Sequence, residues 1–276
     1  MRQNPKFSVL ISVYKKEKPE YLIQCFDSLL QQTLLADEWI IVEDGSLTEG
    51  LYRVLDRYEK QYPKLIKRVK IDDHVGLGAA LAEGVRHCSY ELIARMDADD
   101  VSCKERFERQ IELFLKDPEL DICGSWIEEF DGDIKTIVSR RKVPVKEQDI
   151  KKYQKRRDAF NHMTVMYKKQ AVLEAGNYKS VPLMEDTVLW AQMLRKNAHC
   201  VNIPKYLVKV RVGKAYYERR GGWDYFKLYR AGKKEVLKTG FINQWDYFFA
   251  LFIQFFVALA PMTVRRFIFK RFLHKL

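Results

Sequence analysis

Three acidic residues, Asp97, Asp99 and Asp100, lie within four positions, directly after the apolar run 92–94. Carboxylates at the end of a strand repel one another unless a cation lies between them. Mg²⁺ and Mn²⁺ take oxygen ligands and commonly join one or two carboxylates to the phosphates of a substrate. The cluster therefore indicates a metal-bound diphosphate, and the alternative is that these acids cap the next helix.

Other polar residues follow apolar runs in the same way. Tyr14 and Glu17 come after the run 7–13, and Asp44 comes after the run 38–42. An acid at a strand end can accept a hydrogen bond from the N3–H of a uracil or from a ribose hydroxyl. The alternatives are packing for the aromatic ring and turn formation or helix capping for Asp44.

A further acidic pair, Glu185 and Asp186, stands at the start of a helical pattern. Acids are favourable at this end of a helix because the helix dipole is positive there. A carboxylate held ionised and directed at a hydroxyl group can also act as a general base. Helix capping and base catalysis are therefore both open for this pair.

Alternating elements must position these residues. The first hundred residues predict strands at 7–13, 38–42, 65–71 and 92–96, with helices at 22–30, 51–62 and 79–87. Such alternation is typical of a parallel sheet with helices on both faces, in which ligands bind beyond the carboxyl ends of the strands. Tyr14, Glu17, Asp44 and Asp97 all fall at such ends.

The second half is expected to complete the same domain, to about residue 215. Its predicted elements are a helix at 105–116, strands at 122–130 and 134–138, a surface helix at 146–157, a strand at 163–167, and helices at 170–175 and 186–197. Residues 216–276 then form a helical extension. The fold class is α/β, with a mostly parallel central sheet.

Composition narrows the function. The chain has 276 residues, of which 47% are hydrophobic, and a net charge of +12, mostly in the second half. Nucleic acid, anionic lipid and phosphorylated ligands all fit this charge. No secretion signal is evident at the N-terminus, which predicts a cytoplasmic protein. The five cysteines are scattered and odd in number, so neither disulfides nor a zinc site are expected.

The C-terminal extension has two parts. Residues 245–262 are almost continuously apolar, but they fall short of the about 20 residues that a spanning helix needs. Residues 265–275 interleave cations with aromatic side chains. This pattern suits a helix lying in the headgroup layer of an anionic cytoplasmic leaflet. The alternative is a hairpin packed on the catalytic domain or on a second subunit, as in a homodimer.

Five segments together resemble the inverting glycosyltransferases of family 2, which have the nucleotide-diphospho-sugar transferase (GT-A) fold. They are FSVLISVY at 7–14, VEDGS at 42–46, GLGAAL at 76–81, ARMDADD at 94–100 and MED at 184–186. The resemblance covers roughly residues 5–225, and YYERRGG at 216–222 belongs to it. Within the family, the sequence most resembles bacterial enzymes that extend lipid-linked repeat units of capsule, O-antigen or exopolysaccharide.

The resemblance implies a site for a nucleotide-diphosphate sugar, held with Mn²⁺ or Mg²⁺. Asp99 would be the principal metal ligand, and Asp97 would contact the metal or the ribose. The donor-binding residues would be Val13, Tyr14, Glu17, Asp44, Arg95, Asp97 and Ala98. Arg95 would support the diphosphate or pair with a nearby acid.

The same resemblance assigns the acceptor side of the reaction. Asp186 would be the base that deprotonates an acceptor hydroxyl, and Glu185 would orient donor or acceptor. His162 stands where relatives often have a histidine near the acceptor or the metal, and its alternative is a structural role. The implied acceptor is a lipid-linked saccharide or oligosaccharide at the inner face of the cell membrane, to which the enzyme would be peripherally attached.

The sequence differs from the family pattern in two places, and two other functions are possible for it. The family often has Asn in the segment before Gly76, which here contains His74, and a later Asn is replaced by Ala82. A basic nucleic-acid-binding protein would explain the charge, but no recognition motif is visible and no nucleic-acid partner is expected. A nucleotidyltransferase on a similar sheet would need a Gly-rich phosphate loop with a lysine, which the first strand lacks.

Overall fold

The computed structural model describes residues 4–213, 221–261 and 264. Strands and helices alternate through the first half of the fold: β1 (Phe7–Tyr14), α1 (Pro19–Leu30), β2 (Glu38–Asp44), α2 (Glu49–Gln61), β3 (Ile66–Ile71), α3 (Leu77–His87) and β4 (Leu92–Asp97). Every residue of β2 is buried, as expected for a strand covered on both faces. The predicted elements of this half are confirmed, with ends shifted by a few residues.

The second half is less regular. Its elements are β5 (Val101–Ser102), α4 (Arg106–Lys116), β6 (Leu120–Phe130), β7 (Ile137–Arg141), α5 (Glu147–Gln154), the 3₁₀ turn η1 (His162–Thr164), β8 (Met166–Lys168), α6 (Lys169–Glu174), α7 (Glu185–Arg195), β9 (His199–Arg211), α9 (Trp223–Lys238) and α10 (Gln244–Leu259). The strand predicted at 163–167 is wrong in its first half, which is η1. The strand predicted at 134–138 begins only at Ile137.

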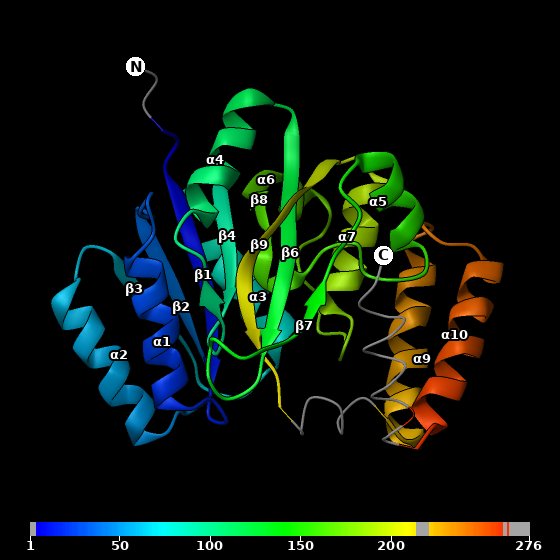
Figure 1. Cartoon of the computed structure of the whole chain (residues 1–276), viewed down its shortest axis with the longest axis horizontal. Helices are drawn as coiled ribbons and strands as arrows, with labels where there is room; N and C mark the ends of the chain where they lie inside the picture. Colours follow the sequence, from blue (N-terminus) through cyan, green and yellow to red (C-terminus); the bar gives the residue numbers. More distant parts are fainter. Residues whose placement is uncertain (1–3, 214–220, 262–263, 265–276) are drawn as a thin grey trace.

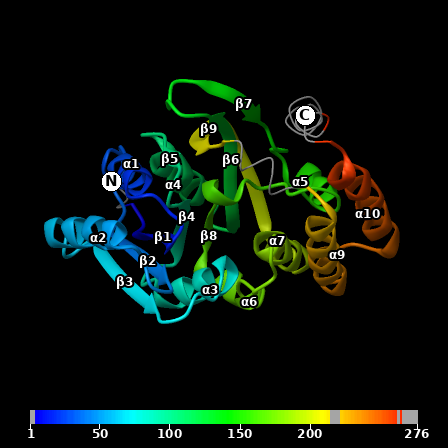
Figure 2. The same ribbon diagram turned by 90° about the horizontal axis from the view of Figure 1, so that it is seen from below.

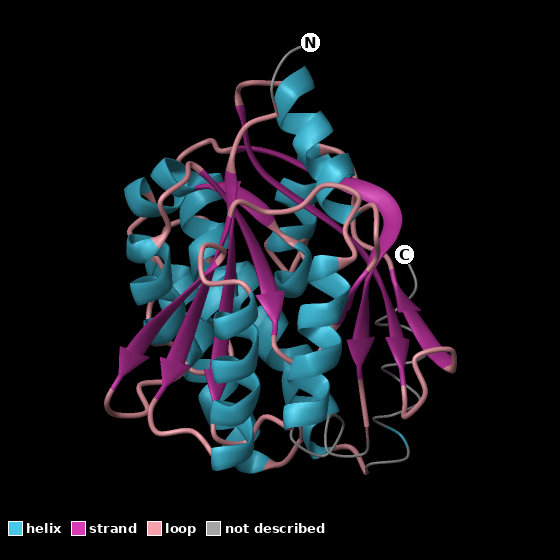
Figure 3. Cartoon of the chain, turned by 90° about the vertical axis from the view of Figure 1, so that its left-hand side faces the viewer, coloured by secondary structure: helices cyan, strands magenta, loops and turns pink. Residues whose placement is uncertain are grey.

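The strands of the described residues form one sheet in the order β3-β2-β1-β4-β8-β6-β9-β5, with β7 beside β6. The pairs among β3, β2, β1 and β4 are parallel, whereas β8 runs antiparallel to both β4 and β6. Helices cover both faces of this sheet (Figures 1 and 3). The predicted α/β class is confirmed, and the sheet is mixed because the second half adds antiparallel pairs.

The core is divided by the sheet. Val9 and Ile11 face the side covered by α1, α2 and α4, while Leu10 faces α3 and α7, and Figure 2 shows these two layers. Successive residues of a strand point to opposite faces. Arg95 and Asp97 are therefore on the same side of β4 as Ile93, and this is the side of α3 and α7.

The C-terminal helices form a hairpin at one side of the molecule, with α10 outermost (Figures 1 and 2). Helix α9 packs on α7 through a small apolar cluster that includes Met184, Val188 and Val236. Helix α10 ends at Leu259, just before Pro261. Among the described residues, no helix combines the length and apolar character needed to cross a bilayer. Residues 216–220 and the predicted basic helix at 265–275 lie outside the described part.

Candidate active site

The carboxyl ends of three neighbouring strands bring the predicted site residues to one edge of the sheet. Tyr14 pairs in register with Asp44 on β2, and Ser12 pairs with Asp97 on β4. The turn after β1 returns toward this edge, because the backbone N–H of Glu17 donates to the carbonyl of Tyr14 at 3.0 Å. The edge therefore gathers residues from three separate sequence segments.

Two of the predicted donor-binding residues turn their side chains inward. Val13 and Ala98 are both buried in the core cluster on the α1 side of the sheet. Their neighbours Tyr14 and Asp97 are partly exposed at the edge. Val13 and Ala98 can therefore offer only backbone atoms to a ligand at this edge.

Asp44 organises the turn that leads into α3. Its carboxylate accepts hydrogen bonds from the backbone N–H groups of Val75 at 2.7 Å and Gly76 at 3.1 Å. His74 Nδ1 lies 2.9 Å from the same carboxylate, and the His74 ring stacks on Tyr14 with centroids 5.8 Å apart. The residue that departs from the family pattern thus joins the two predicted nucleoside-binding residues.

Arg95 is the positive centre beneath this edge. It is 2% exposed and forms an ion pair with Asp97, two residues along the same face of β4. Burial lowers the pKa of Arg95, but the charge and hydrogen bond of Asp97, together with the charges of Tyr178 and Asp100, outweigh burial and the pKa is raised. Within the described part of the chain, its Nε and Nη1 atoms lack a hydrogen-bond partner. These two N–H groups can serve a bound anion.

Asp99 and Asp100 differ in their surroundings. Burial, followed by the charge of Asp97, raises the pKa of Asp99 to about 6. Asp100 is buried and accepts a hydrogen bond from the backbone N–H of Arg211, at the end of β9, at 2.9 Å. The capping alternative is wrong for this cluster, because α4 begins only at Arg106 and Glu105 is its N-cap.

The acids at this edge fit a divalent cation. No group of three or more His, Cys, Asp or Glu side chains gathers as a ligand set among the described residues. Mg²⁺ and Mn²⁺ need only one or two protein carboxylates when phosphate oxygens and water supply the rest. Asp97 and Asp99 supply two, and the raised pKa of Asp99 reflects a negative charge that a cation would balance.

His162 lies beside the start of α7. It is buried, with Nε2 3.0 Å from the Tyr178 hydroxyl and Nδ1 3.9 Å from the Asp186 carboxylate. Burial and then the charge of Arg95 lower its pKa well below the ordinary value, so His162 is neutral. Its polar contacts are thus with Tyr178 and Asp186.

Glu185 and Asp186 occupy the first two positions of α7. Asp186 Oδ1 accepts a hydrogen bond from the Thr187 backbone N–H at 2.7 Å. Burial, then the charges of Asp158 and Glu185, raise the pKa of Asp186 well above its ordinary value. Such a shift brings a carboxyl group closer to neutral pH, where an efficient general base titrates.

Asp158 is a residue that the sequence interpretation missed. The Thr187 hydroxyl donates to Asp158 Oδ1 at 2.6 Å, so one threonine contacts both carboxylates. The segment 156–158, RRD, gives no motif, and its position depends on tertiary contacts. Its place beside Asp186 follows from the contact between this loop and Thr187 of α7.

The two halves of the site meet at Gly78. A Cβ atom at this position would lie 2.2 Å from the carbonyl oxygen of Lys179 and 2.9 Å from Cβ of Glu185. Glycine allows this close approach of backbone segments. The turn held by Asp44 is thereby brought against the start of α7.

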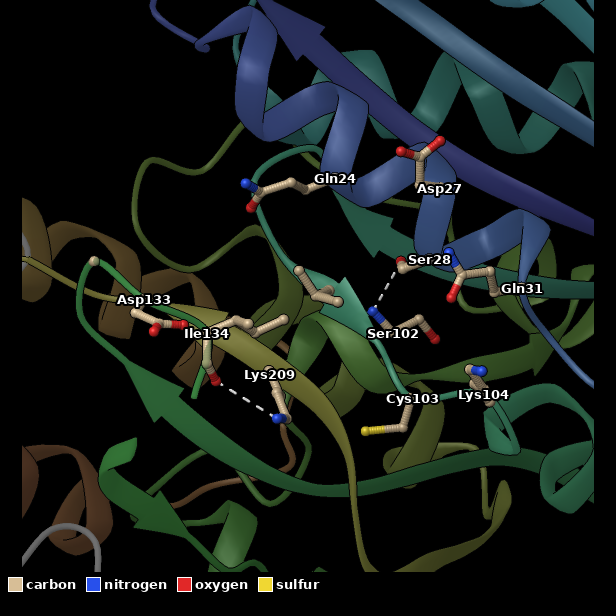
Figure 4. Close-up of a pocket in the computed structure, with 12 residues that line it drawn as sticks. Gln24, Asp27, Ser28, Gln31, Ser102, Cys103, Lys104, Asp133, Ile134 and Lys209 are labelled. Atoms are coloured by element: carbon tan, nitrogen blue, oxygen red, sulfur yellow. Dashed lines mark hydrogen bonds between the residues drawn. The ribbon is translucent and has the colours of Figure 1, made fainter. Parts of the chain in front are cut away.

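The structure also contains a cavity of about 610 Å³ on the α1 side, shown in Figure 4. It lies between α1, β5 and the turn that joins β6 to β7, and Ser28, Ser102 and Lys209 are among its lining residues. None of the residues predicted for the donor or the base lines this cavity. The candidate site is therefore the carboxyl edge of the sheet.

Comparison with known sequences gives the family. Residues 8–173 match Glycosyl transferase family 2. The amylovoran biosynthesis glycosyltransferase AmsE of Erwinia amylovora is 39% identical over 269 residues, which are 96% of this chain and 98% of AmsE. An Escherichia coli protein, UDP-Gal:alpha-D-GlcNAc-diphosphoundecaprenol beta-1,3-galactosyltransferase, is 34% identical over 98% of each chain.

Solved structures support the fold. S. aureus TarS in complex with UDP-GlcNAc superposes with a TM-score of 0.64 at 17% identity, over 96% of this chain and 74% of that one. The mannosyltransferase PcManGT from Pyrobaculum calidifontis, with GDP-Man and Mn²⁺, also gives 0.64 at 15% identity, over 92% and 70%. With the match over residues 8–173, these similarities show that the chain belongs to glycosyltransferase family 2, has a GT-A-like fold and is a glycosyltransferase.

Proposed function

We propose that this glycosyltransferase moves a sugar from a UDP-sugar to a hydroxyl group of a lipid-linked saccharide, with inversion at the anomeric carbon. The observation that carries the proposal is the proximity of the paired Arg95 and Asp97 to the acids at the start of α7, since the charges of both act on Glu185 and that of Arg95 also acts on Asp186. The E. coli relative supports both substrates, because its name states a UDP-sugar donor and a diphosphoundecaprenol-linked acceptor.

The donor would lie along the carboxyl edge. Tyr14 and His74 offer stacked rings for the nucleobase of the donor, while Asp44 fixes the turn beside these rings. Glu17 and the backbone atoms of Val13 and Ala98 complete the donor side. The unpartnered N–H groups of Arg95 can donate to the diphosphate, since guanidinium groups suit phosphate oxygens.

Asp97 and Asp99 would hold the divalent cation. Mn²⁺ or Mg²⁺ held there would supply positive charge to the departing diphosphate and so lower the barrier to breaking the sugar–phosphate bond. Two fold neighbours, PcManGT and GalNAc-T7, have solved structures with Mn²⁺. The polar contacts of His162 fit better with a place beside the base than with a third metal ligand.

Asp186 would act as the base. Its carboxylate takes the proton of the acceptor hydroxyl as that oxygen bonds to the anomeric carbon, and the bond from this carbon to the diphosphate breaks. Attack from the face opposite the leaving group inverts the centre in one displacement, so no covalent nucleophile on the protein is needed. Glu185, next to the first turn of α3, would orient donor or acceptor.

Attachment to the inner face of the cell membrane would bring the enzyme to its acceptor. One side of α10 exposes a row of apolar residues, namely Trp245, Phe248, Phe249, Phe252, Phe256 and Leu259. The residues after α10 include Arg265, Arg266, Lys270 and Arg271, which suit anionic headgroups. A bilayer surface accounts for both the apolar row and the charge, whereas a homodimer would account for the row alone.

The test is a panel of nucleotide sugars with a diphosphoundecaprenol-linked saccharide acceptor, scored by UDP release with Mn²⁺, Mg²⁺ or chelator. We expect metal-dependent UDP release and loss of about 10² or more in rate in Asp99→Ala. Glu108→Ala, on the exposed side of α4, is the control. Release of pyrophosphate would instead indicate a nucleotidyltransferase, and metal-independent turnover would contradict the role of Asp99.

A further inference from the structure

We infer that Lys233 of α9 and Asp158 are positioning residues for Asp186, so that the C-terminal hairpin forms part of the support of the catalytic base. This inference rests on the proposed role of Asp186 as base. Three features that the reaction itself does not explain would then have a function: the buried Lys233, the contact of Asp158 with Thr187, and the close packing of α9 on α7 at Gly232.

The first step is the contact between Asp158 and the base. Thr187 donates its backbone N–H to Asp186 Oδ1 at 2.7 Å and its hydroxyl to Asp158 Oδ1 at 2.6 Å. The same hydroxyl lies 3.4 Å from Asp186 Oδ1. Asp158 is held in turn by Gln154 of α5, whose side-chain amide donates to it at 3.4 Å. A shift of Asp158 would therefore be transmitted to Asp186.

The second step is the charge behind Asp158. Lys233 is only 2% exposed, and its Nζ donates to the carbonyl of Lys155 at 3.4 Å. Burial lowers the pKa of Lys233, while the charges of Asp158 and Asp246 oppose that shift. A buried cation is costly unless opposite charges balance it. Lys233 thus contacts the backbone three residues before Asp158, and its charge is opposed to those of Asp158 and of Asp246 in the first turn of α10.

The third step is the packing of α9 on the residue before the base pair. A Cβ atom on Gly232 would lie 2.9 Å from Cγ and 3.1 Å from Cβ of Met184. Met184 is the N-cap of α7, immediately before Glu185. The close approach fixes the distance between α9 and the start of α7. The next residue of α9, Lys233, donates to the carbonyl of Lys155 in the segment that leads to Asp158.

These contacts give Lys233 a role in the position and charge of the base. Asp158 and Glu185 both act on Asp186 as like charges. Lys233 offsets the charge of Asp158. This reduces the repulsion among the carboxyl groups of Asp158, Glu185 and Asp186, so that they can keep one ordered arrangement. Tyr14 and Asp44, which would bind the nucleoside, lie on other elements. Removal of the lysine charge should therefore impair transfer without impairing donor binding.

The decisive experiment compares Lys233→Met, Asp158→Asn and the double variant with Lys234→Met, which changes the exposed neighbour on α9. Each is measured for transfer kcat, donor KM, UDP binding by calorimetry and Tm. We expect Lys233→Met to lower kcat about tenfold or more with UDP affinity within about twofold. The double variant should be less impaired than the product of the two single effects, because neutral Asn needs no balancing charge.

Several outcomes would overturn the inference. Unchanged kcat in Lys233→Met would do so, as would additive effects in the double variant or equal losses of kcat and UDP affinity. If Lys233→Met does not fold, Asp158→Asn decides by the same split between kcat and UDP affinity. Asp186→Asn distinguishes the proposed base from its proposed support. Full transfer in Asp186→Asn would rule out Asp186 as the base. Loss of transfer in Asp186→Asn with normal kcat in Lys233→Met would rule out only the positioning role of Lys233.

Discussion

Gly78 and Glu185 approach so closely that a Cβ atom on Gly78 would lie 2.9 Å from Cβ of Glu185. Gly78 belongs to the first turn of α3, and Glu185 begins α7, the helix of the proposed base. The same Cβ would lie 2.2 Å from the Lys179 carbonyl, a backbone atom that cannot rotate away. The distance between the two halves of the site is therefore set by the absence of a side chain at Gly78.

Gly78→Ala is expected to destabilise the protein although alanine favours helices. Helix propensity would add about 0.5–1 kcal/mol to the free energy of unfolding, whereas overpacking of this kind costs about 1–3 kcal/mol. Denaturant unfolding and transfer assays should show lower stability and lower kcat. Gly213→Ala is the control, because the nearest atom to its added Cβ is 4.0 Å away. Equal stability of the two variants would contradict this account.

Asp186→Asn should separate activity from stability. Burial raises the folded-state pKa of Asp186 above the ordinary 3.8, so the folded chain binds this proton more tightly than the unfolded chain. For this group, stability falls as pH rises from 3.8 through the raised pKa. We expect the variant to lose transfer, keep UDP binding and gain in Tm at neutral pH.

The pH series provides the control for that prediction. The gain in Tm of Asp186→Asn over the unmodified chain should shrink as the pH is lowered toward 3.8, where neutral carboxyl and amide groups are similar. Transfer by the unmodified chain should rise with pH through the folded pKa, because only the ionised carboxylate accepts a proton. A gain in Tm that does not depend on pH would argue against the charge of Asp186 as its source.

The sequence predicted which residues gather at the carboxyl edge of the sheet better than it predicted the surroundings of Asp186. Tyr14, Asp44 and Asp97 end apolar runs, and parallel strands bring such ends together without further information. Asp158 reaches the base only through Thr187, 29 residues away, and no local pattern marks such a contact. The long strand β9 was not predicted, since Pro204, Lys205 and Lys209 interrupt its apolar run. Its pairing with β6 along most of its length outweighs that local signal.

His74 should affect donor affinity more than turnover. It stacks on Tyr14 and contacts Asp44, so His74→Ala removes one ring of the stack and one partner of the carboxylate. We expect donor KM to rise about tenfold with kcat nearly unchanged. His74→Asn, which keeps a polar side chain beside Asp44 but removes the ring, should recover part of the affinity. His87→Ala, at the exposed end of α3, is the control, and an equal effect there would contradict a donor role for His74.

The exposed row on α10 predicts binding to anionic vesicles. Phe252 is 64% exposed, so Phe252→Glu should leave Tm nearly unchanged. The variant loses the burial of one aromatic side chain in the membrane, which should weaken the binding free energy by about 2 kcal/mol. Flotation with vesicles containing anionic lipid should show about thirtyfold weaker binding, and added salt should weaken binding of the unmodified chain. Leu35→Glu, on a residue 56% exposed elsewhere on the surface, should bind as before. If Phe252→Glu instead converts a dimer to a monomer and vesicle binding persists, the row on α10 is a subunit interface and the membrane assignment is wrong.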